Sequence, residues 1–186
     1  TATSKNYRTF TGFSFDMATS HLVSLVTACG NWIVQDCYFG GVGANVVAIN
    51  AAGTGTTNTM RRCVFMGGRG TSITFTHSVV VSNAAYLVEN CLFLAQRNNG
   101  VNTVRVGGIT VKNCFGMGLT NFVAITTAVT VGQAFVVNNC IAAWNNLAFS
   151  GTVTGEIIED YNILWGNNTD RTNTATGTNS NDFPPL

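Results

Sequence analysis

One nine-residue motif recurs five times along this 186-residue chain, and each copy contains a cysteine near its centre. The copies are IVQDCYFGG (33–41), MRRCVFMGG (60–68), LVENCLFLA (87–95), TVKNCFGMG (110–118) and VVNNCIAAW (136–144). The motif cysteines, Cys37, Cys63, Cys91, Cys114 and Cys140, are 26, 28, 23 and 26 residues apart, and Tyr161 of IIEDYNILW aligns in a sixth place 21 residues later. A constant motif at such variable intervals is typical of a solenoid in which loop lengths differ while the strands stay in register.

Alignment on the cysteine shows which side chains face the core. The positions three before and two after the cysteine are mostly apolar, which predicts that they point inward with the thiol. The position before the cysteine is mostly Asn or Asp, residues that tolerate the left-handed backbone of a tight bend. We therefore expect two short strands joined by a bend in each coil, with coils about 4.8 Å apart. The inward columns are Val34, Met60, Val88, Val111, Val137, Ile158 and Phe39, Phe65, Phe93, Gly116, Ala142, Ile163, and the bend column is Asp36, Arg62, Asn90, Asn113, Asn139, Asp160.

The repeated order of an apolar residue, Asn-Cys and Phe resembles the right-handed parallel β-helix proteins of the pectin-lyase-like superfamily, over roughly residues 9–166. The resemblance implies an all-β fold, a right-handed parallel β-helix of about six to seven coils. β-Rich stretches at 44–50, 71–83, 100–108, 121–132 and 147–155 are expected to supply the remaining strands. We expect the β-helix to span residues 1–166, and a polar C-terminal loop or tail to lead out of it over residues 167–186.

The six cysteines leave three arrangements open. Five of them share one inward column, where a thiol behaves as a small buried hydrophobe. Adjacent coils are also close enough for disulfides, including one between Cys29 and Cys37. Metal binding is the third alternative, but the sequence contains no CxxC pair, and we expect neither a metal site nor a cofactor.

The low charge of the chain limits its partners. Charged residues make up 9% of the sequence and the net charge is +1, so we expect no binding to nucleic acid. No run of 18 apolar residues is present, so we expect no membrane insertion. Abundant Gly, Thr, Asn and β-branched residues, with few helix formers, suit an extracellular or virion-surface β protein.

The resemblance also implies a polysaccharide lyase or glycoside hydrolase, and glycoside hydrolysis usually needs two carboxyl groups about 5–10 Å apart. The aligned columns never place two carboxylates on successive coils. Glu156, Glu159 and Asp160 form the only acidic cluster, which we interpret as solvated charge at the edge of the last coil, and His21 and His77 are isolated. We therefore expect no catalytic residues in this segment.

Two tryptophans are candidate ligand contacts. Trp144 and Trp165 each lie four residues after the motif cysteine or its substitute, with Asn145 and Asn167 nearby. Indole faces beside amides suit the recognition of a surface glycan, so these four residues form a candidate sugar site. An aromatic stack that closes the core is the alternative.

The position after the cysteine is apolar in five coils, although it should point outward: Tyr38, Val64, Leu92, Phe115 and Ile141, followed by Asn162. A strand that is apolar on both faces is normally covered on both. Three explanations of this column are open. It is covered by another copy in a homo-oligomer or filament, it is covered by loops of the same chain, or the inward and outward directions are the reverse of those assigned here. We predict a structural or adhesive module of a larger assembly such as a tail spike, fibre or surface filament; a carbohydrate-binding or polysaccharide-degrading fragment is the alternative.

Overall fold

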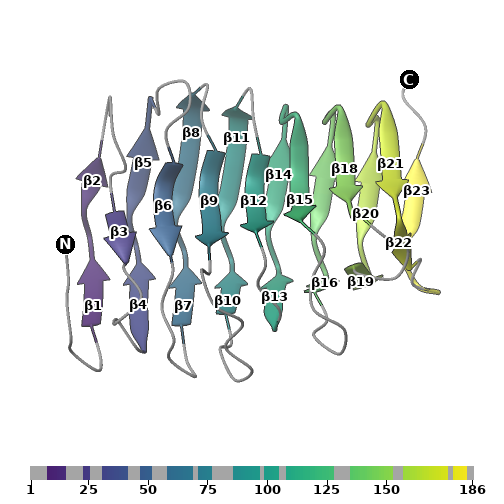
Figure 1. Ribbon diagram of the computed structural model, residues 1–186. Helices are drawn as coiled ribbons and strands as arrows, with labels where there is room; N and C mark the ends of the chain where they lie inside the picture. The colour runs from purple at the N-terminus through teal and green to yellow at the C-terminus, as the bar shows by residue number, and fades with distance from the viewer. Residues whose placement is uncertain are drawn as a thin grey trace.

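The computed structural model describes residues 8–15, 23–25, 31–41, 47–51, 58–68, 71–76, 86–96, 99–104, 108–127, 135–152, 157–175 and 178–183. Every regular element within these residues is a β-strand, and every strand pairing is parallel. Figure 1 shows the strands side by side in a row that runs from the N-terminal end to the C-terminal end.

The strands form three sheets. Sheet I contains β1 (Arg8–Thr11), β4 (Trp32–Gln35), β7 (Asn58–Arg61), β10 (Tyr86–Glu89), β13 (Ile109–Lys112), β16 (Phe135–Asn138), β19 (Ile157–Asp160) and β22 (Thr174–Ala175). Sheet II contains β2 (Ser14–Phe15), β5 (Tyr38–Gly40), β8 (Val64–Gly68), β11 (Leu92–Gln96), β14 (Phe115–Met117), β17 (Ile141–Ala143), β20 (Ile163–Trp165) and β23 (Asn181–Phe183). Sheet III contains β3 (Val23–Leu25), β6 (Val47–Ala51), β9 (Thr71–Thr76), β12 (Asn99–Val104), β15 (Asn121–Thr127), β18 (Leu147–Ser150) and β21 (Thr169–Thr172).

Consecutive strands enter sheets I, II and III in turn, so three strands complete one coil of a parallel β-solenoid. The described strands make seven such coils, and β22 and β23 begin an eighth. The prediction of an all-β parallel β-helix is confirmed, with slightly more coils than expected. The β-rich stretches between the motifs form the strands of sheet III, as predicted.

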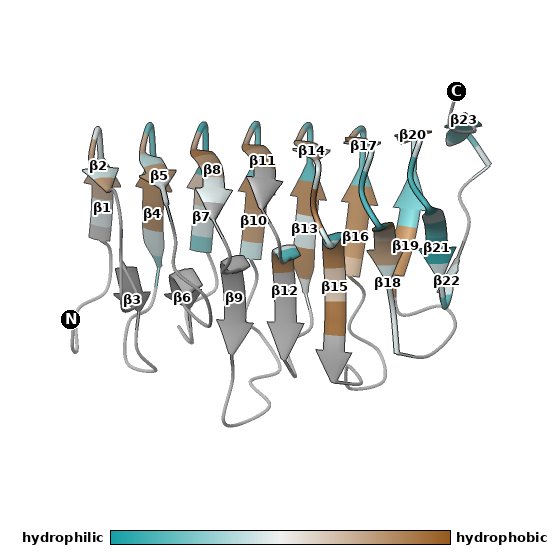
Figure 2. Ribbon diagram, turned by 90° about the horizontal axis from the view of Figure 1, so that it is seen from above, coloured by the Kyte–Doolittle hydropathy of each residue, from teal (hydrophilic) through white to brown (hydrophobic). Residues whose placement is uncertain are grey.

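The expectation of a loop or tail after residue 166 is corrected by the structure. Strands β21, β22 and β23 continue all three sheets past this point. Polar strands can extend the solenoid because each new strand only has to continue the backbone hydrogen bonds of the coil before it. Figure 2 shows this end of the solenoid, at β21 and β23, in hydrophilic colours.

The bend between sheets I and II is made by one residue with a left-handed backbone. Its φ is 55° at Asp36, 52° at Arg62, 54° at Asn90, 52° at Asn113, 52° at Asn139 and 56° at Tyr161. The first five are the predicted bend residues. In the sixth coil of the alignment the bend is Tyr161 rather than Asp160, because the pairing of β16 with β19 sets Val137 opposite Glu159 and Asn138 opposite Asp160.

This one-residue shift changes which side chains face the core in the last motif. Asn162, not Tyr161, continues the cysteine column, and Leu164, not Ile163, continues the phenylalanine column, since Ala142 pairs with Leu164. The reason is a hydrogen bond: Asn162 Oδ1 accepts from the Cys140 backbone N–H at 2.8 Å, as Cys140 Sγ accepts from the Cys114 N–H at 3.5 Å. At this position, a buried side-chain atom accepts a hydrogen bond from the backbone N–H of the previous coil.

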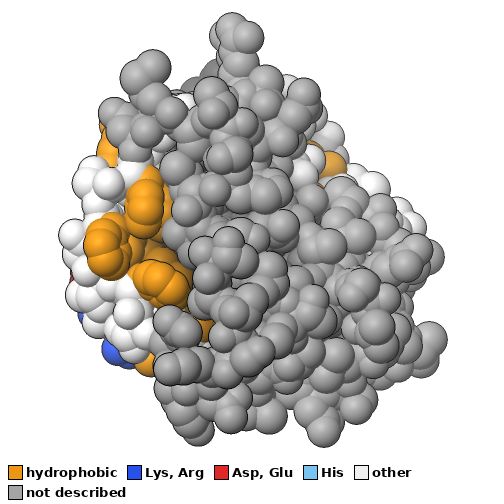
Figure 3. Space-filling model, turned by 60° about the vertical axis from the view of Figure 1, so that its left-hand side comes forward, with side chains coloured by type: hydrophobic (Ala, Val, Ile, Leu, Met, Phe, Trp, Pro, Cys, Tyr) orange, Lys and Arg blue, Asp and Glu red, His pale blue; other side chains and the backbone are white. Residues whose placement is uncertain are grey.

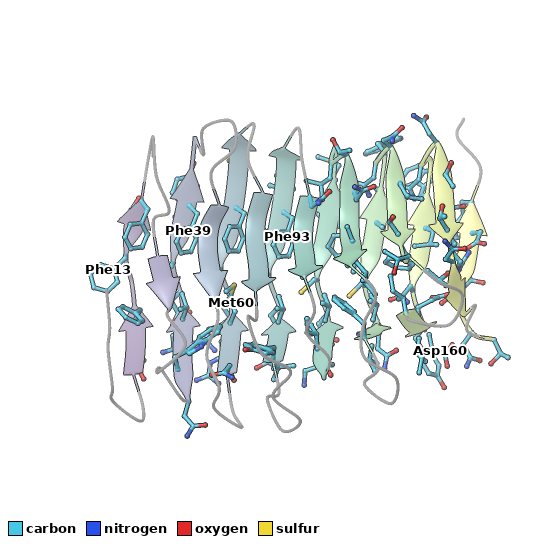
Figure 4. The ribbon with its side chains drawn as sticks, in the orientation of Figure 1. Phe13, Phe39, Met60, Phe93 and Asp160 are labelled. Carbon is cyan, nitrogen blue, oxygen red and sulfur yellow. The ribbon has the colours of Figure 1, made fainter. Side chains whose placement is uncertain are left out.

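The core contains a ladder of phenyl rings. Phe15, Phe39, Phe65 and Phe93 stack along the axis with centroid separations of 5.1, 4.8 and 5.0 Å and interplanar angles below 10°; Figure 4 shows Phe39 and Phe93 in this row. At the next coil the column holds Gly116, whose missing side chain leaves room for Phe122 of sheet III. Aromatic packing thus crosses from sheet II to sheet III at this coil.

The ladder reaches the N-terminal end of the described solenoid. Phe13 is half exposed there, and its ring centroid lies 5.8 Å from that of Phe15. Figure 3 brings this end forward and shows hydrophobic side chains gathered on its described surface. The phenyl column is therefore less covered at its first coil than in the middle of the chain.

The five motif cysteines are buried free thiols, which confirms the thiol-ladder interpretation for these positions. Each thiol donates to the carbonyl two residues earlier, at 3.1 Å for Cys37 and 3.3 Å for Cys140. Burial raises the pKa of the Cys37 and Cys140 thiols, so both stay protonated at neutral pH. Cys29 lies outside the described residues, and Cys37 is free rather than bonded to it.

Candidate functional site

The outer face of sheet II is apolar along two parallel columns. The first, called here the apolar stripe, contains the predicted Tyr38, Val64, Leu92, Phe115 and Ile141, and continues with Ile163 in place of the expected Asn162. Tyr38, Leu92, Ile141 and Ile163 are 38–40% exposed. Because the next residue of each strand is buried in the core, the stripe points outward and the inverted-direction alternative is excluded.

The second column was not noticed in the sequence. Its residues lie two positions further along the strands of sheet II than the apolar stripe. They are Met66, Leu94, Met117, Ala143, Trp165 and Phe183. Met66 and Phe183 are 45% and 51% exposed. Side chains two residues apart on a strand share a face, so both columns belong to one surface, called here the sheet II face. The sequence signal is an apolar residue three positions after the cysteine in four of the five motif copies, whereas the first copy has Gly40 there.

A groove of about 450 Å³ runs along the bend beside the apolar stripe. The bend residues form one wall, where Asn139 Nδ2 donates to Asn113 Oδ1 of the neighbouring coil at 2.8 Å. The stripe forms the other wall. The groove is lined by Asn90, Asn113, Asn139, Tyr161, Cys91, Cys114, Cys140, Leu92, Phe115, Ile141 and Ile163.

Charged residues near this bend pair along the solenoid axis. Arg62 contacts both carboxylate oxygens of Asp36, at 2.6 and 2.8 Å, and Lys112 Nζ lies 3.1 Å from Glu89. Arg61 donates to Gln35 at 2.8 Å. These contacts link neighbouring coils along the bend and engage Arg61, Arg62 and Lys112 within the chain.

The structure brings Trp144 and Trp165 together on the surface. Their ring centroids lie 4.9 Å apart at an angle of 42°, and the side chains are 54% and 36% exposed. The alternative of an aromatic stack closing the core is therefore wrong. The two residues are offset in register, because Trp165 pairs with Ala143, so that Trp144 aligns with Gly166.

Asn145 and Asn167 do not face a ligand, contrary to expectation. Both are buried and bond to the backbone of the preceding coil: Asn145 Nδ2 donates to Gly116 O at 3.2 Å, and Asn167 Nδ2 donates to Ala142 O at 2.9 Å. At the corner between sheets II and III, called here the second corner, they occupy the position that the cysteines occupy at the corner between sheets I and II. The exposed amides at this corner are those of Asn146 and Asn168.

The environment of Glu159 differs from the one that the sequence predicted. It was interpreted as solvated, yet it is 1% exposed. Its Oε1 accepts from Arg171 Nε at 2.8 Å, and its Oε2 accepts from Asn162 at 2.7 Å and from the Ser180 hydroxyl. Arg171 also pairs with Asp182. These contacts form a polar cluster, called here the polar plug, which joins sheets I and III inside the last coils; its members are Glu159, Asn162, Arg171, Ser180 and Asp182. Figure 4 labels the adjacent Asp160 at this end.

The described carboxylates are already engaged within the chain. They pair as Asp36 with Arg62, Glu89 with Lys112, Glu159 and Asp182 with Arg171, Asp160 with Asn179, and Asp170 with Asn167. The hydrogen bond from Arg62 lowers the pKa of Asp36, and the Asn179 backbone N–H lowers that of Asp160. A glycosidase acid needs a raised pKa, the opposite shift.

Other candidate chemistry falls partly outside the described residues. Glu156, His21 and His77 lie in segments that the structure does not describe. Among the residues that it does describe, no group of three or more His, Cys, Asp or Glu side chains could hold a metal ion. The same residues include no helix long and apolar enough to cross a membrane.

The geometry defines the class of the protein as a parallel β-solenoid with an apolar outer face on sheet II. Comparisons with protein-family models, with curated proteins and with solved structures found no match for this chain. The fold is thus assigned from the molecule itself, and function has to be argued from its surfaces.

Proposed function

We propose that this chain is a non-catalytic β-helical module of a larger extracellular or virion-surface assembly, such as a tail spike, fibre or surface filament, and that it self-associates through the sheet II face. We further propose that it is a divergent member of the pectin-lyase-like superfamily, on the strength of the repeated Asn-Cys and Phe positions.

The sheet II face is the observation that carries the proposal. Soluble monomers seldom expose a continuous apolar surface that extends over many coils, and such surfaces mark sites of association. The face is regular, because each coil adds the same two outward positions. A second copy presents the same regular face, so the two surfaces match in both spacing and chemistry.

The native mass of the particle, measured by light scattering, tests this proposal. The double variant Leu92→Asp, Phe115→Asp places two charges in the middle of the stripe, where burial against another copy would be costly. The wild type should be a multimer and the double variant a monomer with the same far-ultraviolet circular dichroism.

Ile158→Asp is the matched control. Ile158 is 47% exposed but lies on sheet I, so this variant should keep the wild-type mass. A monomeric wild-type protein, or a double variant that remains a multimer, would contradict self-association through this face.

A further inference from the structure

Trp144 occupies a backbone position where four other coils place glycine. Its φ is 51°, and the equivalent bend residues between sheets II and III are Gly41, Gly67, Gly118 and Gly166, with φ between 55° and 69°. A bulky side chain in this region is disfavoured, and such outliers concentrate at functional sites. The indole is more than half exposed, so core burial does not explain its presence.

The next coil is shaped to receive this indole. A Cβ on Gly166 would lie 2.8 Å from Cδ1 and 2.9 Å from Nε1 of Trp144, so the ring rests directly on the glycine backbone. Trp165 flanks it at 4.9 Å between centroids. One side of the Trp144 ring is therefore supported by the protein, and the exposed remainder forms an angled aromatic surface with Trp165.

Two exposed amides adjoin the indoles. Asn146 and Asn168 each lie two residues after the bend that holds Trp144 or Gly166, and Asn168 Nδ2 donates to Asn146 Oδ1 at 3.2 Å. Each carboxamide can make further hydrogen bonds as donor and acceptor. Flat apolar rings beside donors and acceptors match a pyranose, which has an apolar ring face and a rim of hydroxyl groups.

The charges described at this end of the solenoid favour a neutral ligand at the indoles. Asp182 pairs with the buried Leu164, so its carboxylate lies on the other face of β23 from Phe183 and Trp165, and it is bound to Arg171. Arg171, the cation described at this end of the solenoid, is already bound to Glu159 and Asp182. The described part of this corner therefore offers no free cation to an anionic uronate, and a neutral sugar fits the indoles and amides better.

We infer that Trp144, Trp165, Asn146 and Asn168 form a binding platform for a neutral oligosaccharide. The platform lies at the corner between sheets II and III and shares only Trp165 with the sheet II face, whereas the apolar stripe lies along the opposite edge of sheet II. The inference therefore does not depend on self-association through the stripe.

Tryptophan fluorescence provides the test, with maltohexaose, cellohexaose and mannohexaose as neutral probes and a galacturonic acid hexamer as the anionic comparison. Trp32 is fully buried, so changes on titration report on the two exposed indoles. At least one neutral probe should bind, and the anionic hexamer should bind at least tenfold more weakly. Absence of binding by all three neutral probes, or stronger binding of the anionic hexamer, would overturn the inference.

Trp144→Gly is the decisive variant, because it introduces the residue that four other coils use at this bend. It should weaken binding of the neutral probe at least tenfold while the melting temperature stays equal or rises. Trp144→Phe should retain part of the binding. If Trp144→Gly instead lowers the native mass and leaves sugar binding unchanged, the indoles form a protein contact and the inference fails.

Discussion

Replacing Gly116 by alanine should destabilise the protein, because the added methyl group would collide with a buried ring. An ideal Cβ at this position lies 2.3 Å from Cδ2, 2.6 Å from Cγ and 2.8 Å from Cε2 of Phe122. Carbon atoms in favourable contact lie about 3.5–4.0 Å apart, so the ring would have to withdraw by roughly 1 Å. Phe122 is fully buried between Phe93 and Phe149, at centroid distances of 5.9 and 6.3 Å, and has little room to move.

The magnitude follows from two opposing terms. Overpacking a core costs about 1–3 kcal/mol, whereas replacing glycine by alanine at a compatible backbone returns about 0.4–1 kcal/mol by restricting the unfolded chain. The free energy of unfolding should therefore fall by about 1–2 kcal/mol. For a chain of this length, that lowers the melting temperature by roughly 2–8 °C.

Urea unfolding followed by circular dichroism should be measured for Gly116→Ala alone and in a Phe122→Ala background. Removing the ring creates the space that the methyl group needs, so the alanine should cost almost nothing there, although Phe122→Ala itself costs about 3–5 kcal/mol. Gly67→Ala is the control: it meets no atom within 4 Å but has a φ of +55°, so its cost should be the same in both backgrounds. An equal cost of Gly116→Ala in both backgrounds would refute the steric argument.

Three further predictions concern the plug, the cysteine column and the bend. Arg171→Leu should lower the free energy of unfolding by about 3–5 kcal/mol, because it removes the cation that neutralises the buried Glu159 carboxylate. The double variant with Glu159→Leu should recover most of the loss in urea unfolding, and an unstable double variant would contradict this. Asn162→Ala should lower the free energy of unfolding by about 1–3 kcal/mol, because it leaves the buried Cys140 N–H of the preceding coil without an acceptor. Asn162→Cys should lower it less, and equal losses in the two variants would argue against the acceptor role. Because Arg62 lowers the folded pKa of Asp36, this pair should contribute stability above the ordinary pKa of 3.8 and lose it as the pH falls through the lower folded value. Asp36→Asn should flatten that part of the pH profile, and an unchanged profile would count against the pair.

Five motif copies were enough to predict the solenoid, its inward columns and its first bend. Alternation within each copy fixed which side chains share a face, and agreement among copies fixed the register. The sixth copy was misaligned because Asp160 resembles a bend residue and Tyr161 resembles an apolar core residue. The structure shows that hydrogen bonding decides instead, since Asn162 replaces a thiol as the acceptor for the previous coil.

The surfaces were harder to predict than the core. The exposure of Trp144 depends on the second corner, whose only sequence signal is glycine at most equivalent positions. Asn145 and Asn167 appear suited to a ligand in sequence, but the same amide groups satisfy buried backbone groups at that corner. The burial of Glu159 depends on Arg171 of β21 and on Ser180, which directly precedes β23, and neither residue shares a motif with it.

The direction of the strand pairing has a mechanical consequence. Hydrogen bonds of all three sheets join each coil to the next, so they point along the length of the solenoid. A force that pulls the two termini apart along this direction acts mainly on the outermost coil, which can peel away before its neighbour is loaded. Successive motif cysteines are 23–28 residues apart, so each detached coil should release roughly 75–100 Å of extended chain. Single-molecule stretching should therefore show a series of similar small steps in place of one large rupture.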